Sequence, residues 1–154
     1  MNCPDEMDLQ YMNRALALAR VAFAQKEVPV GCVIVHEGRI IAEGHNRREQ
    51  DQNALAHAEL IAIANACAVI GYWRLCDCDL YVTLEPCAMC AGAIVNARVR
   101  RVAFGARDPK AGAVASKLAV FEAGLNHRPQ VSEGILAAES SALLAQFFQA
   151  LRAR

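Results

Sequence analysis

Residues 86–90 read Pro86-Cys87-Ala88-Met89-Cys90 and directly follow an apolar run that predicts a buried strand. Proline is well tolerated at the first position of a helix, because its missing N–H would have no helical partner there. The two thiols, three residues apart, then share one face of the opening turn, where both sulfurs can reach one ion. The positive end of the helix dipole favours the thiolate form that a metal binds. The stretch therefore predicts a strand that leads into a helix with two metal ligands at its start.

A second polar group, His57-Ala58-Glu59, stands upstream, where a polar loop gives way to an apolar helical pattern. One nitrogen ligand from His57 completes a Cys2His set. Zinc held by three protein ligands keeps its fourth tetrahedral position for water, which is the pattern of catalytic sites. We therefore predict one zinc ion per chain on His57, Cys87 and Cys90, with Glu59 as a proton carrier. The alternative is that the cysteines are buried thiols or a redox pair, and that His57 and Glu59 lie on a solvated helix face.

These residues resemble the signature of the zinc-dependent nucleoside and nucleobase deaminases, H-x-E followed by P-C-x-x-C. The resemblance extends to the bacterial tRNA-specific adenosine deaminases and runs from about residue 10 to the C-terminal helix. Outside the metal motifs it is carried by Val28-Pro29-Val30-Gly31, His45-Asn46-Arg47, the segment 81–87, the segment 104–108 and Asn126-His127-Arg128. It implies a three-layer α/β/α cytidine-deaminase-like fold, with a central mixed five-stranded sheet and helices on both faces. It also implies that residues 1–154 form a single zinc-dependent deaminase domain.

The order of elements read from the sequence agrees with such a fold. Periodicity and turn residues predict a helix over 8–25, a hairpin of strands 28–35 and 39–43, a helix from residue 57, a strand over 80–84, a helix to about residue 96, a strand over 99–105, an edge strand over 130–135 and a final helix with an apolar stripe over 143–151. Strands that alternate with helices imply right-handed crossovers and a parallel part of the sheet. Ligand sites in such sheets lie at helix N-termini beyond the carboxyl ends of the strands, where both metal motifs fall.

Length and composition bound the class of protein. A chain of 154 residues with 55% apolar content suits one compact domain with its own core. No apolar run is long enough to span a bilayer, and the N-terminus lacks a basic region followed by an apolar one, so we expect neither anchor nor signal peptide and a cytoplasmic protein. The cysteines outside the motif show no disulfide framework and are interpreted as buried or incidental thiols: Cys3, Cys32, Cys67, Cys76 and Cys78. A second metal site at Cys76 and Cys78 is the alternative.

Charge is balanced overall but unevenly placed. Residues 1–85 carry seven Lys or Arg against twelve Asp or Glu, and residues 86–154 carry nine against four. Such an asymmetry indicates a basic surface that can contact phosphates, with an ordinary solvated face as the alternative.

The resemblance implies the reaction: hydrolytic conversion of adenosine to inosine at the wobble position of a tRNA anticodon. Zinc lowers the pKa of water to about 7, and Glu59 carries protons between that water and the base. The metal motif does not separate adenine from cytosine, so the choice of base depends on the resemblance outside it. One alternative is a deaminase of a free base or nucleotide, guanine or cytosine. The other is an inactive zinc-stabilised nucleic-acid-binding scaffold, which would not need Glu59.

The resemblance implies four main candidates for substrate contacts, Val30, Asn46, Asp108 and Arg107, with further basic residues as candidates for phosphate contacts. Val30 belongs to a matching stretch, and Asn46 has the donor and acceptor needed to read a base edge, although a loop asparagine also stabilises turns. Asp108 can bind a ribose 2′-hydroxyl, or it can cap the turn before Pro109. Candidates for phosphate contacts in the anticodon stem-loop are Arg107, Lys110, Arg98 and Arg128.

The remaining prediction concerns assembly. The high apolar content and the apolar residues of the metal-binding helix, Met89, Ile94 and Val95, leave room for an exposed apolar face. Since relatives of the resembled family form homodimers, we predict a homodimer. Scattered exposed apolar residues are the alternative.

Overall fold

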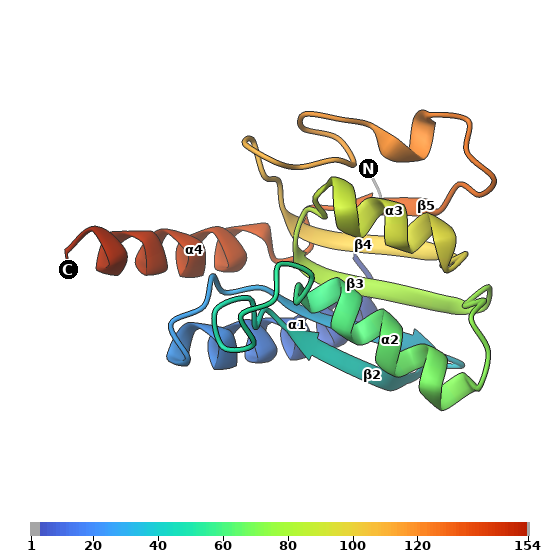
Figure 1. Ribbon diagram of the computed structural model, residues 1–154, viewed down its shortest axis with the longest axis horizontal. Coiled ribbons are helices and arrows are strands. Elements are labelled where there is room, and N and C mark those ends of the chain that lie inside the picture. Colours follow the sequence, from blue (N-terminus) through green and yellow to red (C-terminus); the bar gives the residue numbers. More distant parts are fainter. Residues whose placement is uncertain (1–3, 154) are drawn as a thin grey trace.

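One five-stranded sheet organises residues 4–153, the part of the chain that the computed structural model describes (Figure 1). Its elements in chain order are α1 (Glu6–Ala24), β1 (Gly31–His36), β2 (Arg39–His45), α2 (Ala58–Ile70), β3 (Cys78–Leu84), α3 (Ala88–Asn96), β4 (Arg101–Ala106), the 3-10 helix η1 (Val120–Glu122), β5 (Gln130–Glu133) and α4 (Ala137–Arg152). No helix in residues 4–153 is both long and apolar enough to cross a membrane.

The sheet is mixed, with strand order β2-β1-β3-β4-β5. Strand β1 pairs antiparallel with β2 and with β3, whereas β3, β4 and β5 run parallel. The β1–β2 hairpin turns at Glu37 and Gly38, which both have positive φ, at 51° and 75°. Two left-handed residues form the hairpin turn whose twist matches that of paired strands. The predicted hairpin and the parallel part of the sheet are therefore both present.

Helices cover both faces of the sheet (Figure 1). Helices α2 and α3 lie on one face over the larger core, which includes Ile34, Leu80 and Phe104. Helix α1 covers the other face over a smaller core built around Tyr11 and Met12 and neighbouring strand residues. Helix α4 joins that layer, where Phe147 meets α1, and then continues past the sheet. The predicted three-layer α/β/α fold is confirmed.

Two expectations about α3 were wrong. Cys87 is the N-cap of α3, and its extended backbone (φ −76°, ψ 177°) keeps it outside the helix, so Pro86 precedes the cap instead of occupying the first helical position. Ile94 and Val95 are 0% and 4% exposed because they pack into the chain's own core. They are therefore not part of an apolar surface available to a second copy.

Strand β1 begins at Gly31, three residues later than predicted. A Cβ at Gly31 would lie 2.0 Å from the backbone oxygen of Ala15, so only glycine allows β1 to pack this closely on α1. The preceding residues leave the sheet, and two of them, Val28 and Val30, line a pocket. The close contact of Gly31 with α1 thus lies at the start of β1, directly after the residues that line the pocket.

Candidate metal centre and active-site pocket

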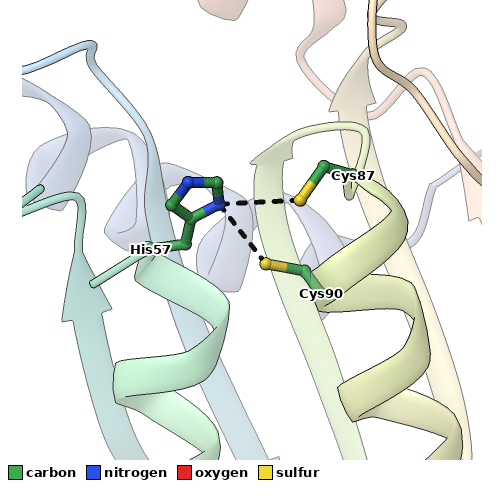
Figure 2. A group of neighbouring side chains, drawn as sticks. All are labelled: His57, Cys87 and Cys90. Carbon is green, nitrogen blue, oxygen red and sulfur yellow. Dashed lines mark hydrogen bonds between the residues drawn. The ribbon is translucent and has the colours of Figure 1, made fainter. Parts of the chain in front are cut away.

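Two helix N-termini meet at the carboxyl end of the parallel strands. His57 is the N-cap of α2 and Cys87 is the N-cap of α3, and neither side chain caps its own helix. Both side chains instead point across the space between the helices (Figure 2). The His57 Nδ1 atom lies 3.6 Å from the Cys87 sulfur and 3.5 Å from the Cys90 sulfur. The three residues form the one group of potential metal ligands found among the described residues.

The spacing of these three atoms fits a zinc ion. A tetrahedral zinc bonded to sulfur at about 2.3 Å and to imidazole nitrogen at about 2.05 Å separates the two ligand atoms by about 3.6 Å. The observed nitrogen–sulfur distances, 3.6 Å and 3.5 Å, agree with that value. Two thiolates and one imidazole also match zinc chemically, and three protein ligands leave a fourth position free.

The charge states of the two thiols differ because each acts on the other. Hydrogen bonds from the Cys90 thiol and from His57 lower the pKa of Cys87 to about 4. The hydrogen bond to Cys87, together with burial, raises the pKa of Cys90. Cys87 is thus a ready thiolate, and binding of a metal releases the proton that remains on Cys90.

Glu59 lies in the first turn of α2, close to the metal ligands and 4% exposed. Burial is the main influence on its carboxyl group, and it raises the pKa of Glu59 above its ordinary value. A carboxyl group with a raised pKa can both accept and return a proton near neutral pH. The position and environment of Glu59 therefore suit a proton carrier.

A pocket of about 200 Å³ opens beside this group. Its wall combines apolar and polar side chains: Val28, Val30, Asn46, Arg48, His57, Ala58, Glu59, Leu84, Glu85, Cys87, Asp108 and Ala111. The structure thus brings together residues from the loop before β1, the loop after β2, both helix N-termini and the loop after β4. Three of the four predicted substrate residues, Val30, Asn46 and Asp108, lie on this wall.

The polar side chains of Asn46 and Asp108 are partly engaged within their own loops. The Asn46 amide donates to the carbonyl oxygen of Val28 at 3.2 Å and accepts from the backbone N–H of Arg48 at 3.1 Å. This leaves one N–H and one lone pair of the amide for a ligand. One Asp108 oxygen accepts the backbone N–H groups of Lys110 and Ala111, which is the turn-capping role considered above. Its second carboxylate oxygen is left for another partner.

The residues predicted to contact phosphate are absent from the pocket wall: Arg107, Lys110, Arg98 and Arg128. Arg107 pairs with Glu133 at 2.8 Å and is absent from the pocket wall. Arg128 pairs with Glu122, and Arg98 donates to two carbonyl oxygens at the end of α3. Substrate contacts by these arginines stay predictions.

Two charged residues on the wall, Arg48 and Glu85, were not singled out from the sequence. Arg48 is the cationic residue of the pocket wall, and it neighbours Asn46 in the same loop. Glu85 is 2% exposed. Burial alone would raise its pKa, but hydrogen bonds from Ser116, Ala115 and Asp108 together lower the pKa of Glu85 to about 2. The sequence offered one signal for Glu85: a charged residue directly after a strand that is predicted to be buried.

The other cysteines are not arranged as a metal site. Cys32 and Cys78 are buried, Cys67 is half-buried and Cys76 is exposed, and all four are free thiols. Within residues 4–153, Cys76 and Cys78 do not join a group of three ligands, so the alternative of a second metal site gains no support. Cys3 lies outside the described residues.

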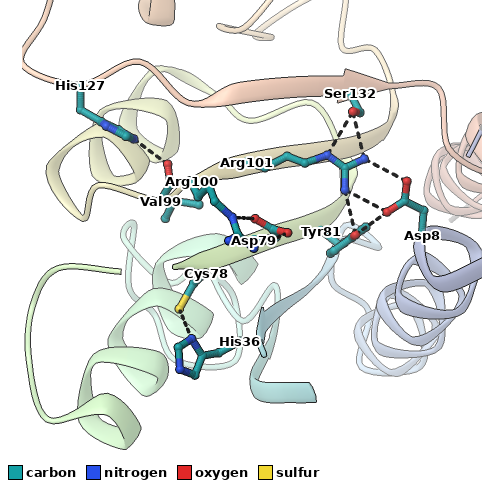
Figure 3. Close-up of polar contacts among 10 residues, drawn as sticks. All are labelled: Asp8, His36, Cys78, Asp79, Tyr81, Val99, Arg100, Arg101, His127 and Ser132. Carbon is teal, nitrogen blue, oxygen red and sulfur yellow. Dashed lines mark hydrogen bonds and ion pairs between the residues drawn. The ribbon is translucent and has the colours of Figure 1, made fainter. Parts of the chain in front are cut away.

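The opposite ends of the same strands carry a second polar cluster (Figure 3). Both guanidinium NH₂ groups of Arg101 donate to the Asp8 carboxylate at 2.9 Å, and Tyr81 donates its hydroxyl hydrogen to the same carboxylate. Arg101 also donates to the Ser132 hydroxyl at 3.0 Å. The cluster ties α1 to β3, β4 and β5.

Comparison with known proteins decides the family. A family model described as MafB19-like deaminase matches residues 6–152. The tRNA-specific adenosine deaminase of Bacillus subtilis is 47% identical over 146 residues, which cover 94% of this chain and 91% of that protein. The chain belongs to the family of tRNA-specific adenosine deaminases. A solved structure from work on A-to-I editing by tRNA:A34 deaminases at the wobble position of transfer RNA is 46% identical, covers 87% of this chain and 98% of that one, and has a TM-score of 0.85.

Guanine deaminases share the fold with the tRNA-specific adenosine deaminases. The guanine deaminase of Bacillus subtilis is 37% identical, covers 94% of this chain and 93% of that one, and has a TM-score of 0.63. Both the identity and the TM-score are lower than for the tRNA:A34 deaminase. The comparisons therefore favour the tRNA deaminases over deaminases of a free base.

Proposed function

We propose that this chain hydrolyses adenosine to inosine at the wobble position of a tRNA anticodon, releasing ammonia. The observation that carries the proposal is the pocket in which Glu59 lies beside His57, Cys87 and Cys90, in a chain 47% identical to a tRNA-specific adenosine deaminase over most of both lengths. We further propose that residues 1–154 act as one deaminase domain with one zinc ion. The intact Glu59 disfavours an inactive scaffold.

The chemistry begins with the three ligands. His57, Cys87 and Cys90 would hold a zinc ion, which would supply an attacking water with a lowered pKa. Glu59 would accept a proton from the attacking water and deliver it to the adenine ring nitrogen beside carbon 6, as the water oxygen adds to carbon 6. Glu59 would then move the proton of the new hydroxyl group to the amino group, which leaves as ammonia and leaves a carbonyl group at carbon 6. Burial of Glu59, which raises its pKa, suits both directions of transfer.

The pocket wall supplies groups that suit a nucleotide. A paired base cannot reach such a site, so the substrate must present an unstacked nucleotide, as an anticodon loop does. The free amide capacity of Asn46 suits a base edge, and the free oxygen of Asp108 suits a ribose 2′-hydroxyl. Arg48 is the cation placed to meet a phosphate, and Val30 offers an apolar contact. Arg107 would reach RNA only after leaving Glu133.

We also propose a cytoplasmic homodimer. Exposed apolar side chains other than those first considered support it: Val69, Ile70, Tyr72 and Trp73 are neighbours at the end of α2, and each is at least 37% exposed. Burial of such side chains stabilises an interface. Light scattering at micromolar concentration tests the proposal, and a monomeric mass refutes it.

The substrate is tested by offering the purified protein an anticodon stem-loop, a stem-loop of the same sequence in DNA, free adenosine and free guanine. Ammonia and the deaminated product are measured for each: inosine from the RNA stem-loop and from adenosine, deoxyinosine from the DNA stem-loop, and xanthine from guanine. We expect the RNA stem-loop to react much faster than the DNA stem-loop, and neither free adenosine nor free guanine to react. Turnover of free guanine without action on the stem-loop would replace the proposal with the free-base alternative.

A further inference from the structure

Glu85 lies between the last residue of β3 and the Pro86-Cys87 turn, and its carboxylate is buried by the loop of residues 108–116. We name this segment the 108–116 loop. Oxygen Oε1 accepts the backbone N–H of Asp108 at 3.0 Å, and Oε2 accepts three backbone N–H groups of the same loop. The three donors to Oε2 are Val114 at 3.1 Å, Ala115 at 2.8 Å and Ser116 at 2.9 Å. The Ser116 hydroxyl also donates to Oε1.

These hydrogen bonds occupy the carboxylate. A carboxylate has about four acceptor positions, and Glu85 accepts five donors, so it has no remaining capacity for a water molecule or a base. Glu59 is the carboxylate that stands beside the metal ligands. Glu85 therefore differs from Glu59 in kind: it lines the pocket without being available for proton transfer.

The loop crosses Glu85 at close range. A Cβ built on Gly112 would lie 2.3 to 2.5 Å from the carboxylate atoms of Glu85, so the backbone passes directly over the carboxylate. A backbone hydrogen bond from Ala113 N–H to the Pro86 carbonyl at 2.9 Å joins the loop to the same turn, and one from Glu85 N–H to the carbonyl of Ala106, the last residue of β4, at 2.8 Å holds the strand end before the loop. The 108–116 loop is thus attached along its length to the turn that carries a metal ligand.

The attachment matters because of where the loop lies. Asp108 and Ala111 form part of the pocket wall, together with Asn46 and Arg48 of the loop after β2. A shift of the 108–116 loop would move that wall relative to Cys87 while leaving the metal ligands in place. The position of the wall would then depend on the side chain of residue 85.

We infer that Glu85 is a positioning residue. It holds the 108–116 loop, and with it the pocket wall, in the position relative to Cys87 that admits the target nucleotide, and thereby sets the affinity for RNA. The inference rests on the proposed function for its substrate. It assigns to Glu85 no part in metal binding or in proton transfer.

The main test is Glu85→Gln in the full-length zinc-loaded protein. In either orientation the new amide nitrogen faces at least two N–H or O–H donors, so those donors lose their acceptor. We expect KM for the RNA stem-loop to rise about tenfold or more, while kcat changes less than about threefold and zinc content stays near one per chain. Hydrogen exchange of the amides of residues 108–116 should accelerate in the variant.

Asp8→Asn is the matched control. It also replaces a buried carboxylate that accepts several hydrogen bonds, but at the opposite end of the sheet. It should lower thermal stability and leave KM and exchange in the 108–116 loop at parental values. If loss of stability alone raised KM, the two variants would behave alike.

Two further variants, of which Ser116→Ala is the milder, serve if Glu85→Gln fails to fold. Ser116→Ala removes one hydroxyl donor and should raise KM about two- to threefold. Gly112→Ala forces the carboxylate aside and should raise KM as Glu85→Gln does. Parental KM and parental exchange in every variant that folds would overturn the inference, as would a loss confined to kcat.

The two proposals fail in different ways. If the parent protein deaminates no stem-loop, the proposed function falls. The exchange measurement still reports whether Glu85 holds the loop, and KM is then measured with whichever base the parent does deaminate.

Discussion

The two ends of strands β3 and β4 handle buried charge in opposite ways. At the amino end, Asp8, Tyr81, Arg101 and Ser132 satisfy one another in a closed cluster (Figure 3). At the carboxyl end, burial opposes the ionisation of Glu59, and the metal ligands His57 and Cys87 face an open pocket. One end ties the layers of the fold together, and the other holds polar groups ready for a ligand.

The pKa directions express the same difference. The hydrogen bond from Arg101 holds the pKa of Asp8 below its ordinary value, so the folded state favours the charged form. Burial raises the pKa of Glu59, so the folded state disfavours its charged form. A group that contributes stability by being ionised suits a scaffold, whereas a group whose ionisation is opposed suits proton transfer.

Removing a metal ligand should have the largest effect on this comparison. His57→Ala or Cys87→Ala leaves two ligands for the zinc ion, so we expect loss of bound zinc and of measurable deamination. Elemental analysis and an inosine assay measure the two quantities. Cys76→Ala is the control, because Cys76 is an exposed thiol away from the site, and it should change neither. Full zinc retention by either ligand variant would contradict the assignment.

Glu59→Ala should separate the ligands from the proton carrier. The three ligands remain, so zinc content and fold should match those of the parent. Without the carboxylate, deamination should fall by a factor of about 10² to 10⁴. Activity within tenfold of the parent would show that another group carries the proton.

Asp8→Asn should weaken the closed end without altering the pocket. Loss of the ion pair should lower the free energy of unfolding by about 2 kcal/mol at pH 7, measured by urea denaturation. Because the folded-state pKa of Asp8 is lowered, its contribution is complete above about pH 4 to 5 and is lost as pH falls through the folded pKa. The difference between parent and variant should therefore shrink below pH 4. Both proteins are compared free of metal, because loss of a bound ion at low pH would also change the free energy of unfolding.

Asp108→Asn should have the smallest effect. It distinguishes a ribose contact of Asp108 from a purely structural role in its turn. If Asp108 binds a ribose 2′-hydroxyl, the variant should lose several-fold activity on RNA and discriminate less against a DNA stem-loop of the same sequence. If Asp108 only caps its turn, activity on both substrates should fall together with thermal stability. The ratio of the two activities, with thermal unfolding measured alongside, distinguishes these outcomes.

Local patterns were enough to predict most of the fold. The apolar strand 80–84, the Pro-Cys helix and the hairpin at Glu37 and Gly38 all depend on neighbouring residues, and all are present. The start of β1 was misplaced because it depends on contact between Gly31 and α1. Likewise, the burial of Ile94 and Val95 depends on which face of α3 meets the sheet.

The same distinction applies to the site. The metal group follows from short spacings and the resemblance, and the structure brings its three residues together. The role of Glu85 depends on donors 23 to 31 residues later, and the ion pair of Arg107 on a partner 26 residues away. Sequence spacing does not reveal such pairings. A charged residue at the end of a buried strand, such as Glu85, can be noticed in the sequence, but its hydrogen-bond donors cannot be identified there.

The crossing of Gly112 over Glu85 also limits how the length of this chain can vary. The carboxylate meets donors spread over residues 108–116, so one inserted or deleted residue there would move the later donors out of register. The stretch 123–126, by contrast, is exposed and supplies none of the donors to Glu85. Added segments, whether acquired by descent or grafted by design, should therefore be accommodated between η1 and β5 and excluded from the loop over Glu85.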